Sequence, residues 1–272
     1  MKKIIAVTGA SGFLGRHIVQ NLVSKKWEVI ALVRNINKAK KIKELNKALI
    51  THFDISKKQA IPLPKKCVLI HCAWDDVRNI FSKKHLGAHY KNQYNFLSRI
   101  IAHGIKKILI TGTSFEYGLQ YGPIFSSTKT KPNTPYAKSK DLLHKNLLKL
   151  RSKINFYLIW TRIFYIYGDG QNPKSVMGLF NEALNQNKKS FNMSFGDQLH
   201  DYLRVEKAAE QIVKLLKYNK GIFNVCSGKP ISLRRLLEME MKEKKRKIKL
   251  NLGYYSYRKS ESTAIWGADP VK

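Results

Sequence analysis

Cysteine is scarce in this chain. Of 272 residues only Cys67, Cys72 and Cys226 are cysteines. Their number is odd and no two of them form a C-x-x-C pair, so the sequence predicts neither a disulfide framework nor a zinc site. We expect a protein without a metal centre in a reducing compartment.

Long apolar runs are also missing. No stretch approaches the roughly 20 apolar residues that a transmembrane helix needs, so no membrane span is predicted. The first residues read as a strand and not as a signal peptide. The expected location is therefore cytoplasmic.

Acidic residues are few. Eighteen Asp and Glu stand against 51 Lys and Arg, which gives a formal net charge of +33. Such a charge is typical of proteins that bind nucleic acid. The lysines, however, occur in pairs along the whole chain, and only KEKKRKIK (242–249) is a dense run. This spread favours a lysine-rich solvated surface over a nucleic-acid interface.

Short apolar segments alternate with helical patterns through the first two thirds of the chain. Strands are predicted at 4–7, 27–34, 49–54, 67–74, 106–113 and 156–168. Helices are predicted after Gly12, over 85–103 and from Tyr136 onward. This alternation is typical of an α/β fold with a doubly wound parallel sheet. After about residue 167 the alternation loosens, and we assign 168–272 to a smaller C-terminal lobe, some of whose strands and helices return to the first domain.

The octapeptide TGASGFLG, Thr8–Gly15, lies between the first predicted strand and the first helix. Its first glycine allows a tight turn, its second lets backbone approach a pyrophosphate, and its third permits close packing of helix on strand. The helix N-terminus attracts the phosphates. Residues 1–167 are therefore predicted to be a Rossmann-type dinucleotide-binding domain. Its expected contacts in this turn are Gly9, Ser11, Gly12, Phe13, Leu14 and Gly15.

A second motif is PYAKSK, which holds Tyr136 and Lys140 as Y-x-x-x-K. Residues four apart share one face of a helix. The positive charge of Lys140 would then lower the pKa of the Tyr136 phenol, so that it passes a proton near neutral pH.

Together these motifs resemble the extended short-chain dehydrogenase/reductases of the NAD-dependent epimerase/dehydratase family, which act on nucleotide sugars. HCAW (71–74), TRIFYIYGDGQNP (161–173), HDYLRVEKAA (200–209) and GIFNVCSGKPISLRRLLE (221–238) resemble further motifs of that family in the same order. The resemblance covers nearly the whole chain. It makes Thr113 the catalytic hydroxyl beside Tyr136 and Lys140, and it implies a homodimer formed through the helices near 84–103 and 136–149.

The same resemblance extends the cofactor site. Arg34 ends the second strand, where a cation suits the 2′-phosphate of NADP and an acid would favour NAD. NADP(H) is therefore the expected cofactor, with NAD(H) as the alternative. Asp54 is expected to hold the adenine amino group. The remaining cofactor contacts that the resemblance implies are Ile55, Cys72, Ala73, Trp74, Asn92, Thr111, Tyr136, Lys140, Ile163 and Phe164.

Departures from the family motifs narrow the reaction. Sugar-nucleotide 4,6-dehydratases carry Asp-Glu after the catalytic Thr, whereas this chain has Ser114 and Phe115. Epimerase/reductases of the GDP-fucose type carry a cysteine at the position of Phe115. Tyr165 stands where 4-epimerases usually have Asn. Several segments resemble enzymes assigned as dTDP-4-keto-6-deoxyhexose reductases, so reduction of the 4-keto group of a nucleotide-linked 6-deoxyhexose, dTDP- or GDP-linked, for surface polysaccharides is the leading hypothesis.

Two alternatives stay open: an NAD-dependent nucleotide-sugar 4-epimerase, and a non-catalytic dinucleotide-sensing or RNA-binding protein. The presence of Thr113, Tyr136 and Lys140 argues against the second. The expected substrate contacts are residues at strand ends and on lobe loops: Trp74, Thr113, Ser114, Glu116, Tyr165, Gln171, Asn192, Gln198 and Asp201.

Overall fold

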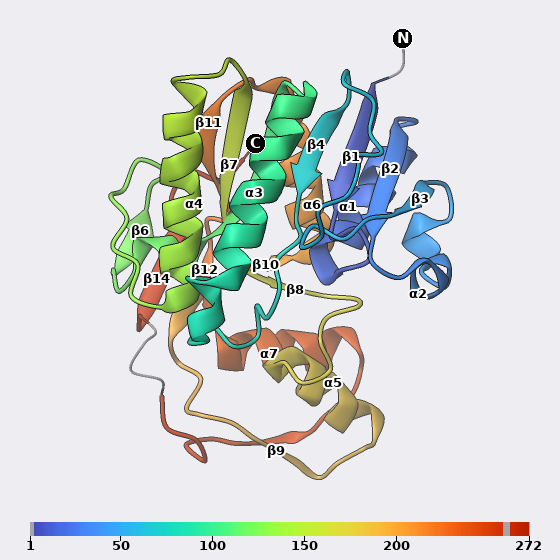
Figure 1. Ribbon diagram of the computed structural model, residues 1–272. Coiled ribbons are helices and arrows are strands. Elements are labelled where there is room, and N and C mark those ends of the chain that lie inside the picture. The colour runs from blue at the N-terminus through green and yellow to red at the C-terminus, as the bar shows by residue number, and fades with distance from the viewer. Residues whose placement is uncertain (1–2, 258–261, 272) are drawn as a thin grey trace.

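Seven parallel strands form the central sheet of the protein, in the order β11-β7-β5-β4-β1-β2-β3 (Figure 1). The computed structural model describes residues 3–257 and 262–271. The strands are β1 (Ile4–Thr8), β2 (Glu28–Val33), β3 (Leu49–His52), β4 (Val68–His71), β5 (Lys107–Thr113), β7 (Tyr157–Ile163) and β11 (Gly221–Val225). The strand order reverses between β1 and β4, so the predicted doubly wound parallel sheet is confirmed.

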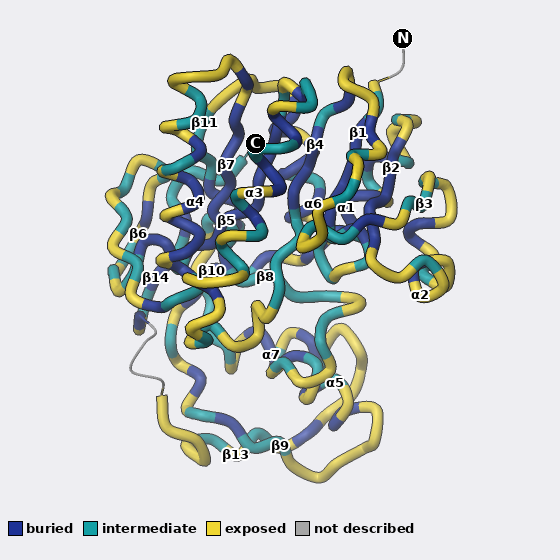
Figure 2. Tube along the Cα trace, viewed as in Figure 1, coloured by how far each residue is buried: buried dark blue, intermediate teal, exposed yellow. Residues whose placement is uncertain are grey.

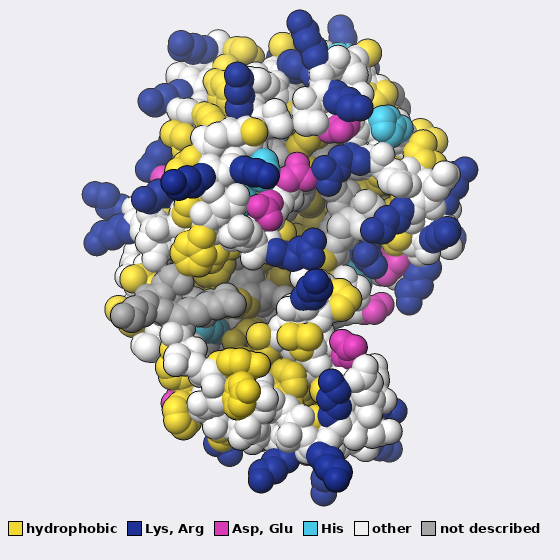
Figure 3. All heavy atoms as spheres, turned by 60° about the horizontal axis from the view of Figure 1, so that its bottom comes forward, with side chains coloured by type: hydrophobic (Ala, Val, Ile, Leu, Met, Phe, Trp, Pro, Cys, Tyr) yellow, Lys and Arg dark blue, Asp and Glu magenta, His cyan; other side chains and the backbone are white. Residues whose placement is uncertain are grey.

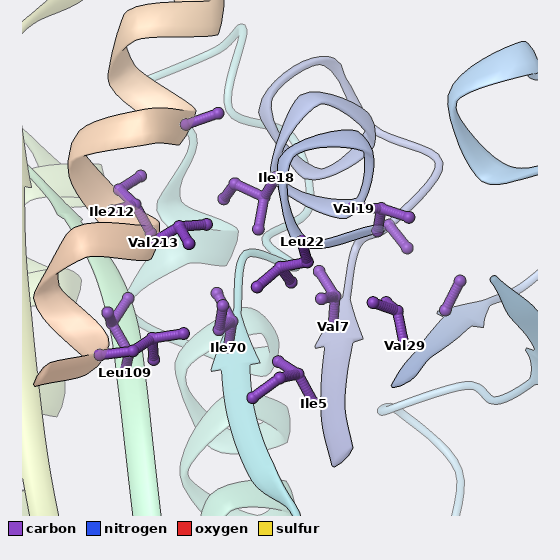
Figure 4. Packing of buried hydrophobic residues seen from close by; sticks show 14 of the residues in the cluster. Ile5, Val7, Ile18, Val19, Leu22, Val29, Ile70, Leu109, Ile212 and Val213 are labelled. Carbon is purple, nitrogen blue, oxygen red and sulfur yellow. The ribbon is translucent and has the colours of Figure 1, made fainter. Parts of the chain in front are cut away.

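Helices cover both faces of this sheet. On one face, α1 (Phe13–Ser24) packs against α6 (Val205–Lys214), and on the other α3 (Ala88–His103) packs against α4 (Pro135–Arg151). Successive strand residues alternate between the two layers: Ile5 and Val7 join the core under α1 and α6, whereas Ala6 joins the core under α3 and α4 (Figure 4). Because both faces are covered, the strands read as continuous apolar runs.

One short helix and one 3-10 turn connect β2 and β3: α2 (Ile36–Lys40), followed by η1 (Lys43–Leu45). Three further 3-10 turns, η2 (Lys83–His85), η3 (Ser114–Tyr117) and η4 (Leu215–Lys217), interrupt the loops. In Figure 2 the buried parts of the trace follow the central strands, while loops and helix ends are exposed. The loops that follow the carboxyl ends of the parallel strands all lie at one edge of the sheet. Ligands bind at this edge in folds of this type.

The chain after residue 167 is shared between two regions. The helices α5 (Val176–Asn185) and α7 (Leu233–Glu243) pack with the strand pair β9 (Ser190–Asn192) and β13 (Lys249–Asn251) into the lower lobe of Figure 1. This lobe has its own core around Phe180 and Leu237. In contrast, α6 and β11 return to the central sheet, so the lobe is not continuous in sequence.

A second, smaller sheet joins the two regions. It contains β6 (Gly122–Ile124), β10 (Leu199–Arg204), β12 (Pro230–Ser232) and β14 (Ala264–Gly267), and β8 (Tyr165–Tyr167) pairs with β10. The single strand predicted over 156–168 is therefore two strands. The break falls at Phe164, whose ring is buried in a small cluster with Tyr117 and Cys226 and whose N–H bonds to the Val225 carbonyl. This break sends Tyr165 away from the central sheet.

Basic side chains are spread over the surface. Figure 3 shows Lys and Arg scattered across the face it presents, without a single dense stripe. Within the described residues, we find no helix that is both long enough and apolar enough to cross a bilayer.

Candidate active site at the carboxyl ends of the central strands

The glycine turn between β1 and α1 has the geometry of a phosphate cradle. The Gly12 N–H donates to the Gly9 carbonyl at 2.9 Å, and Gly12 is the N-cap of α1. A Cβ on Gly15 would lie 2.1 Å from the Gly9 oxygen, so only glycine lets α1 approach the strand this closely. The N–H groups at the start of α1 can therefore meet an anion.

A cavity of about 400 Å³ opens beside this turn. Its lining includes Gly9, Ser11, Gly12, Arg34, Ile55, Cys72, Ala73 and Trp74. The predicted strand 67–74 ends at His71 in the structure, and the freed residues 72–74 form one wall of the cavity. Arg34 is held by Asp75 in an ion pair of 2.9 Å. The open helix end beside this cavity suits an anionic ligand, such as the pyrophosphate of the predicted dinucleotide.

Other expected cofactor contacts lie elsewhere. Phe13 and Leu14 begin α1, where Leu14 packs on the core and Phe13 meets the edge of His17. The Asp54 carboxylate accepts hydrogen bonds from the N–H and Oγ of Ser56, and Ile163 packs against the core. Asn92 lines a hollow with Lys57 and Arg99, and this hollow shares Ile55 with the cavity beside the glycine turn. Phe164 is buried in the small cluster described above. The cofactor contacts expected of Asn92 and Phe164 stay predictions.

Lys140 is almost completely buried on α4. Thr134 caps this helix by accepting the Ala137 N–H, and Pro135 occupies its first turn. The Lys140 Nζ donates to the Thr111 carbonyl at 2.7 Å and lies 3.9 Å from the centroid of the Trp74 ring. Burial lowers the pKa of Lys140 to about 7. The ammonium is thus fixed between the end of β5 and the wall of the dinucleotide cavity.

Tyr136 lies one turn before Lys140 among aromatic rings. Its ring centroid is 6.0 Å from that of Trp74 and 5.2 Å from that of His85, and the Lys140 Nζ is 5.9 Å from it. Burial, aided by the negative charge of Glu116, raises the pKa of Tyr136 above its ordinary value. This differs from the predicted lowering by Lys140, because desolvation of the phenol is the largest influence on its pKa and Glu116 acts in the same direction. The phenol is therefore protonated at neutral pH.

Thr113 ends β5 and caps η3. Its Oγ1 accepts the Phe115 N–H at 3.3 Å, and its own N–H donates to Glu116 Oε1 at 2.9 Å. Glu116 is 0% exposed and pairs with Arg162 at 3.0 Å. The prediction of Glu116 as a substrate contact is wrong, because its carboxylate is enclosed by protein donors. Ser114, 7% exposed, is also buried next to it.

A second cavity of about 550 Å³ lies between β8 and the lower lobe. Tyr165, Gln171, Asn192 and Gln198 from the predicted substrate set line it, together with His200, whose ring stacks on that of Tyr165 at 4.7 Å. Asp201 does not line it. The Asp201 carboxylate is 0% exposed and accepts N–H groups of Ser227, Gly228 and Gly267, so the substrate contact predicted for it is wrong.

Several residues of the site were not predicted from the sequence. His85 accepts a hydrogen bond at Nδ1 from the Trp74 indole N–H at 3.1 Å, Asp75 neutralises Arg34, and Tyr255 and Tyr257 line the second cavity. Asp75 directly follows HCAW in the sequence, so its position next to that motif could have pointed to it. His85 comes later, at the start of the predicted helix, and had no such signal. The two tyrosines follow β13, which pairs with β9, and the Tyr257 hydroxyl donates to Asp197; no local sequence pattern reports such long-range contacts.

Comparisons with known proteins agree with this geometry. Residues 5–226 match the profile of the "NAD dependent epimerase/dehydratase family". The chain belongs to this family. It is 32% identical over 270 residues to the dTDP-6-deoxy-L-talose 4-dehydrogenase (NAD(+)) of Aggregatibacter actinomycetemcomitans, covering 97% of this chain and 99% of that one. It is 26% identical to a putative UDP-glucose 4-epimerase of Methanocaldococcus jannaschii, over 87% and 81% of the two chains.

Among solved structures, the UDP-glucuronic acid 4-epimerase from Bacillus cereus, in complex with UDP-glucuronic acid and NAD, superposes with a TM-score of 0.81. The match covers 97% of this chain and 90% of that one at 20% identity, and it shows the shared fold. As a member of the epimerase/dehydratase family, this chain is an NAD-dependent enzyme of the extended short-chain dehydrogenase/reductase type.

Proposed function

We propose that this family member reduces the 4-keto group of a nucleotide-linked 6-deoxyhexose, dTDP- or GDP-linked, in the synthesis of surface polysaccharides. The observation that carries the proposal is the meeting of Tyr136 and Lys140 with the dinucleotide cavity through Trp74. The full-length similarity to a dehydrogenase named for a dTDP-linked 6-deoxy sugar supports the substrate class. The second cavity, next to β8, has room for a nucleotide sugar.

Each side chain has a definite part in this reaction. Tyr136, protonated at neutral pH, donates its proton to the C4 oxygen of the sugar. Thr113 Oγ1 bonds to the same oxygen, and the Lys140 ammonium stabilises the negative charge that develops beside it. Tyr165, Gln171, Asn192 and Gln198 hold the nucleotide sugar. A nicotinamide dinucleotide, when bound, supplies the hydride.

We further propose that the cavity takes NADP(H) as well as NAD(H). Arg34 and Lys38 both line its adenosine end, and cations there suit a 2′-phosphate. Asp75 pairs with Arg34 at 2.9 Å and so partly neutralises its charge. This weakens the preference for a 2′-phosphate and allows NAD(H) to bind as well. The turn residues Gly9, Ser11, Gly12 and Gly15 would hold the pyrophosphate, with Ile55 and Cys72–Trp74 along the adenosine and nicotinamide halves.

Substitution of Tyr136 tests the reaction. Tyr136→Phe keeps the ring against Trp74 and His85 but removes the proton donor, so kcat should fall by about 10²-fold or more with little change in cofactor affinity. Thr113→Val should lower kcat in the same sense. A Tyr136→Phe variant with near-normal kcat would remove Tyr136 from the reaction.

A 4-epimerase is the second candidate, favoured by the similarity to a putative UDP-glucose 4-epimerase. An epimerase oxidises and reduces the same sugar, so it retains its cofactor through turnover. Protein purified with tightly bound NAD that interconverts two UDP-sugars without net cofactor consumption would favour this candidate.

We also propose a homodimer formed through α3 and α4. These helices lie side by side on one face of the sheet (Figure 1). Leu86, just before α3, and Leu142 and Leu148 on α4 are more than a third exposed, as expected of an apolar contact surface. Size-exclusion chromatography with light scattering gives the mass that tests this.

A further inference from the structure

A buried ion pair lies directly beneath the end of β5. The Glu116 carboxylate accepts the Thr113 N–H at 2.9 Å, the Trp160 indole N–H at 3.0 Å and Arg162 Nε at 3.0 Å. The side chains of Glu116 and Arg162 are 0% and 4% exposed. Among the described residues, all three hydrogen-bond partners of this carboxylate are donors, an arrangement that suits the ionised form.

The space for this carboxylate is built into the sheet. Gly112 lies between Thr111 and Thr113 on β5, and a Cβ there would lie 2.4 Å from Glu116 Oε1. Trp160, one of the Glu116 donors, belongs to the core beneath α3 and α4. The carboxylate therefore lies in the layer between the sheet and α4, the helix that carries Lys140 and Tyr136.

Arg162 is itself fixed. Its guanidinium donates to the Ser126 carbonyl at 3.1 Å and lies 4.6 Å from the centroid of the Tyr117 ring. The Tyr117 hydroxyl in turn donates to Asn224 at 2.6 Å. Both partners of the ion pair are therefore enclosed by protein groups.

Five titratable groups among the described residues act on Lys140 or contact the rings beside it: His71, Cys72, Tyr136, His85 and Glu116. Burial lowers the pKa of His85, so its ring is uncharged near neutral pH. Burial lowers the pKa of His71 to about 3 and raises that of Cys72 to about 12, and the pKa of Tyr136 is also raised. The first three groups are therefore uncharged near neutral pH. Glu116 remains as the counter-charge, although burial raises its pKa, because Arg162 and the N–H donors oppose that rise.

We propose that Glu116 is a positioning residue of the active site, which fixes Thr113 through its backbone N–H and supplies the buried negative charge that acts on Lys140 and Tyr136. Lys140 has lost its hydration shell, and a nearby anion keeps its ammonium form accessible at neutral pH. The same anion adds to the burial that raises the pKa of the Tyr136 phenol. The kinetic part of this inference rests on the proposed reductase function, whereas the electrostatic part does not.

The electrostatic part is tested by titrating Lys140 in the full chain. In protein labelled at the lysine ε-carbon, the NMR resonance of Lys140 titrates near neutral pH, away from exposed lysines, and is assigned by its loss in Lys140→Met. In Glu116→Gln the amide retains a hydrogen-bond acceptor but no charge. We expect the pKa of Lys140 to fall by about one pH unit or more.

Two companion variants keep this test decisive. Glu116→Gln leaves Arg162 buried without a counter-charge and can fail to fold; the double variant with Arg162→Gln removes both charges and should still lower the pKa of Lys140. Glu240→Gln is the matched control, because Glu240 is also buried and paired with an arginine, Arg204, in the lower lobe. It should leave the pKa of Lys140 unchanged. An unchanged Lys140 pKa in the folded Glu116 variants, or an equal fall in Glu240→Gln, overturns the proposal.

The kinetic part has its own readout. Glu116→Gln should lower kcat at least tenfold with KM for the nucleotide sugar little changed, and its pH profile should move to lower pH together with the pKa of Lys140. A protein inactive toward every keto-sugar would refute the proposed function and leave the titration result standing. A normal kcat and an unmoved pH profile would refute the positioning role.

Discussion

The Lys140 Nζ lies over the indole ring of Trp74, 3.9 Å from its centroid, and the same indole donates its N–H to His85. Trp74 also lines the dinucleotide cavity. One side chain thus connects the cofactor cavity, the buried ammonium and the ring of Tyr136. We therefore propose that Trp74 acts in both cofactor binding and catalysis.

Truncation of Trp74 should therefore affect activity. We expect Trp74→Ala to lower kcat/KM by about tenfold or more, the scale of a desolvated cation–π contact. Trp74→Phe keeps a ring over Lys140 but cannot donate to His85, so it should lose less. Steady-state kinetics together with cofactor titration separate the two effects. Equal losses in both variants would mean that the hydrogen bond to His85, and not the ring, is what matters.

Lys140 should destabilise the fold at neutral pH. Its pKa is about 7 in the folded chain and ordinarily 10.5, so the unfolded chain binds more protons between these values. The resulting cost is fully present below about pH 7 and disappears as the pH rises toward 10.5. Lys140→Met should therefore raise the free energy of unfolding at pH 7, by on the order of a few kcal/mol, while abolishing activity.

Denaturant unfolding at several pH values measures this effect. Lys138→Met, an exposed position on the same helix, is the control and should change the stability little. A Lys140→Met variant that is less stable than the unmodified chain at pH 7 would contradict the assigned burial cost.

Cofactor choice should respond to Asp75. Asp75→Asn frees Arg34 from its ion pair, so affinity for NADPH should rise several-fold while affinity for NADH changes little. Arg34→Glu should reverse the preference toward NADH. Fluorescence titration of both cofactors against the three proteins makes the comparison. If Asp75→Asn leaves the ratio of the two affinities unchanged, Arg34 does not contact the 2′-phosphate.

The glycine turn should not tolerate a methyl group. In Gly15→Ala the new Cβ would lie 2.1 Å from the Gly9 oxygen, so α1 must move away from β1. We expect a loss of dinucleotide binding and a lower Tm, because overpacking against backbone cannot relax through a side chain. Calorimetry in the presence and absence of cofactor reports both. Wild-type affinity in Gly15→Ala would mean that the turn does not hold the pyrophosphate.

Local patterns predicted the parts of this structure that local physics determines. The glycine turn between β1 and α1, the order of the central strands along the chain and the helix that carries Tyr136 follow from short-range periodicity and turn chemistry. The ends of the strands were predicted less well, since the strand expected at 67–74 ends at His71. The break at Phe164 was missed because a ring buried among distant residues, and not a local turn signal, ends the strand.

Charged residues were harder to place. Glu116 and Asp201 were assigned to the cleft because they follow or lie on strand ends, where ligands bind. Burial against Arg162 and against the N–H groups of residues 227, 228 and 267 decides otherwise, and these partners lie 26 or more positions away in sequence. The direction of the Tyr136 pKa was missed for a similar reason, since helical spacing reports its distance from Lys140 but not its burial.

The most direct test of the central claim is to follow NADPH absorbance while purified protein meets 4-keto-6-deoxyhexoses linked to dTDP, GDP, CDP or UDP, with NADH in parallel. We expect oxidation of the reduced cofactor with a dTDP- or GDP-linked substrate, and loss of this activity in Tyr136→Phe. No consumption with any of the four, in protein that interconverts UDP-sugars with NAD bound, would contradict the proposed reduction.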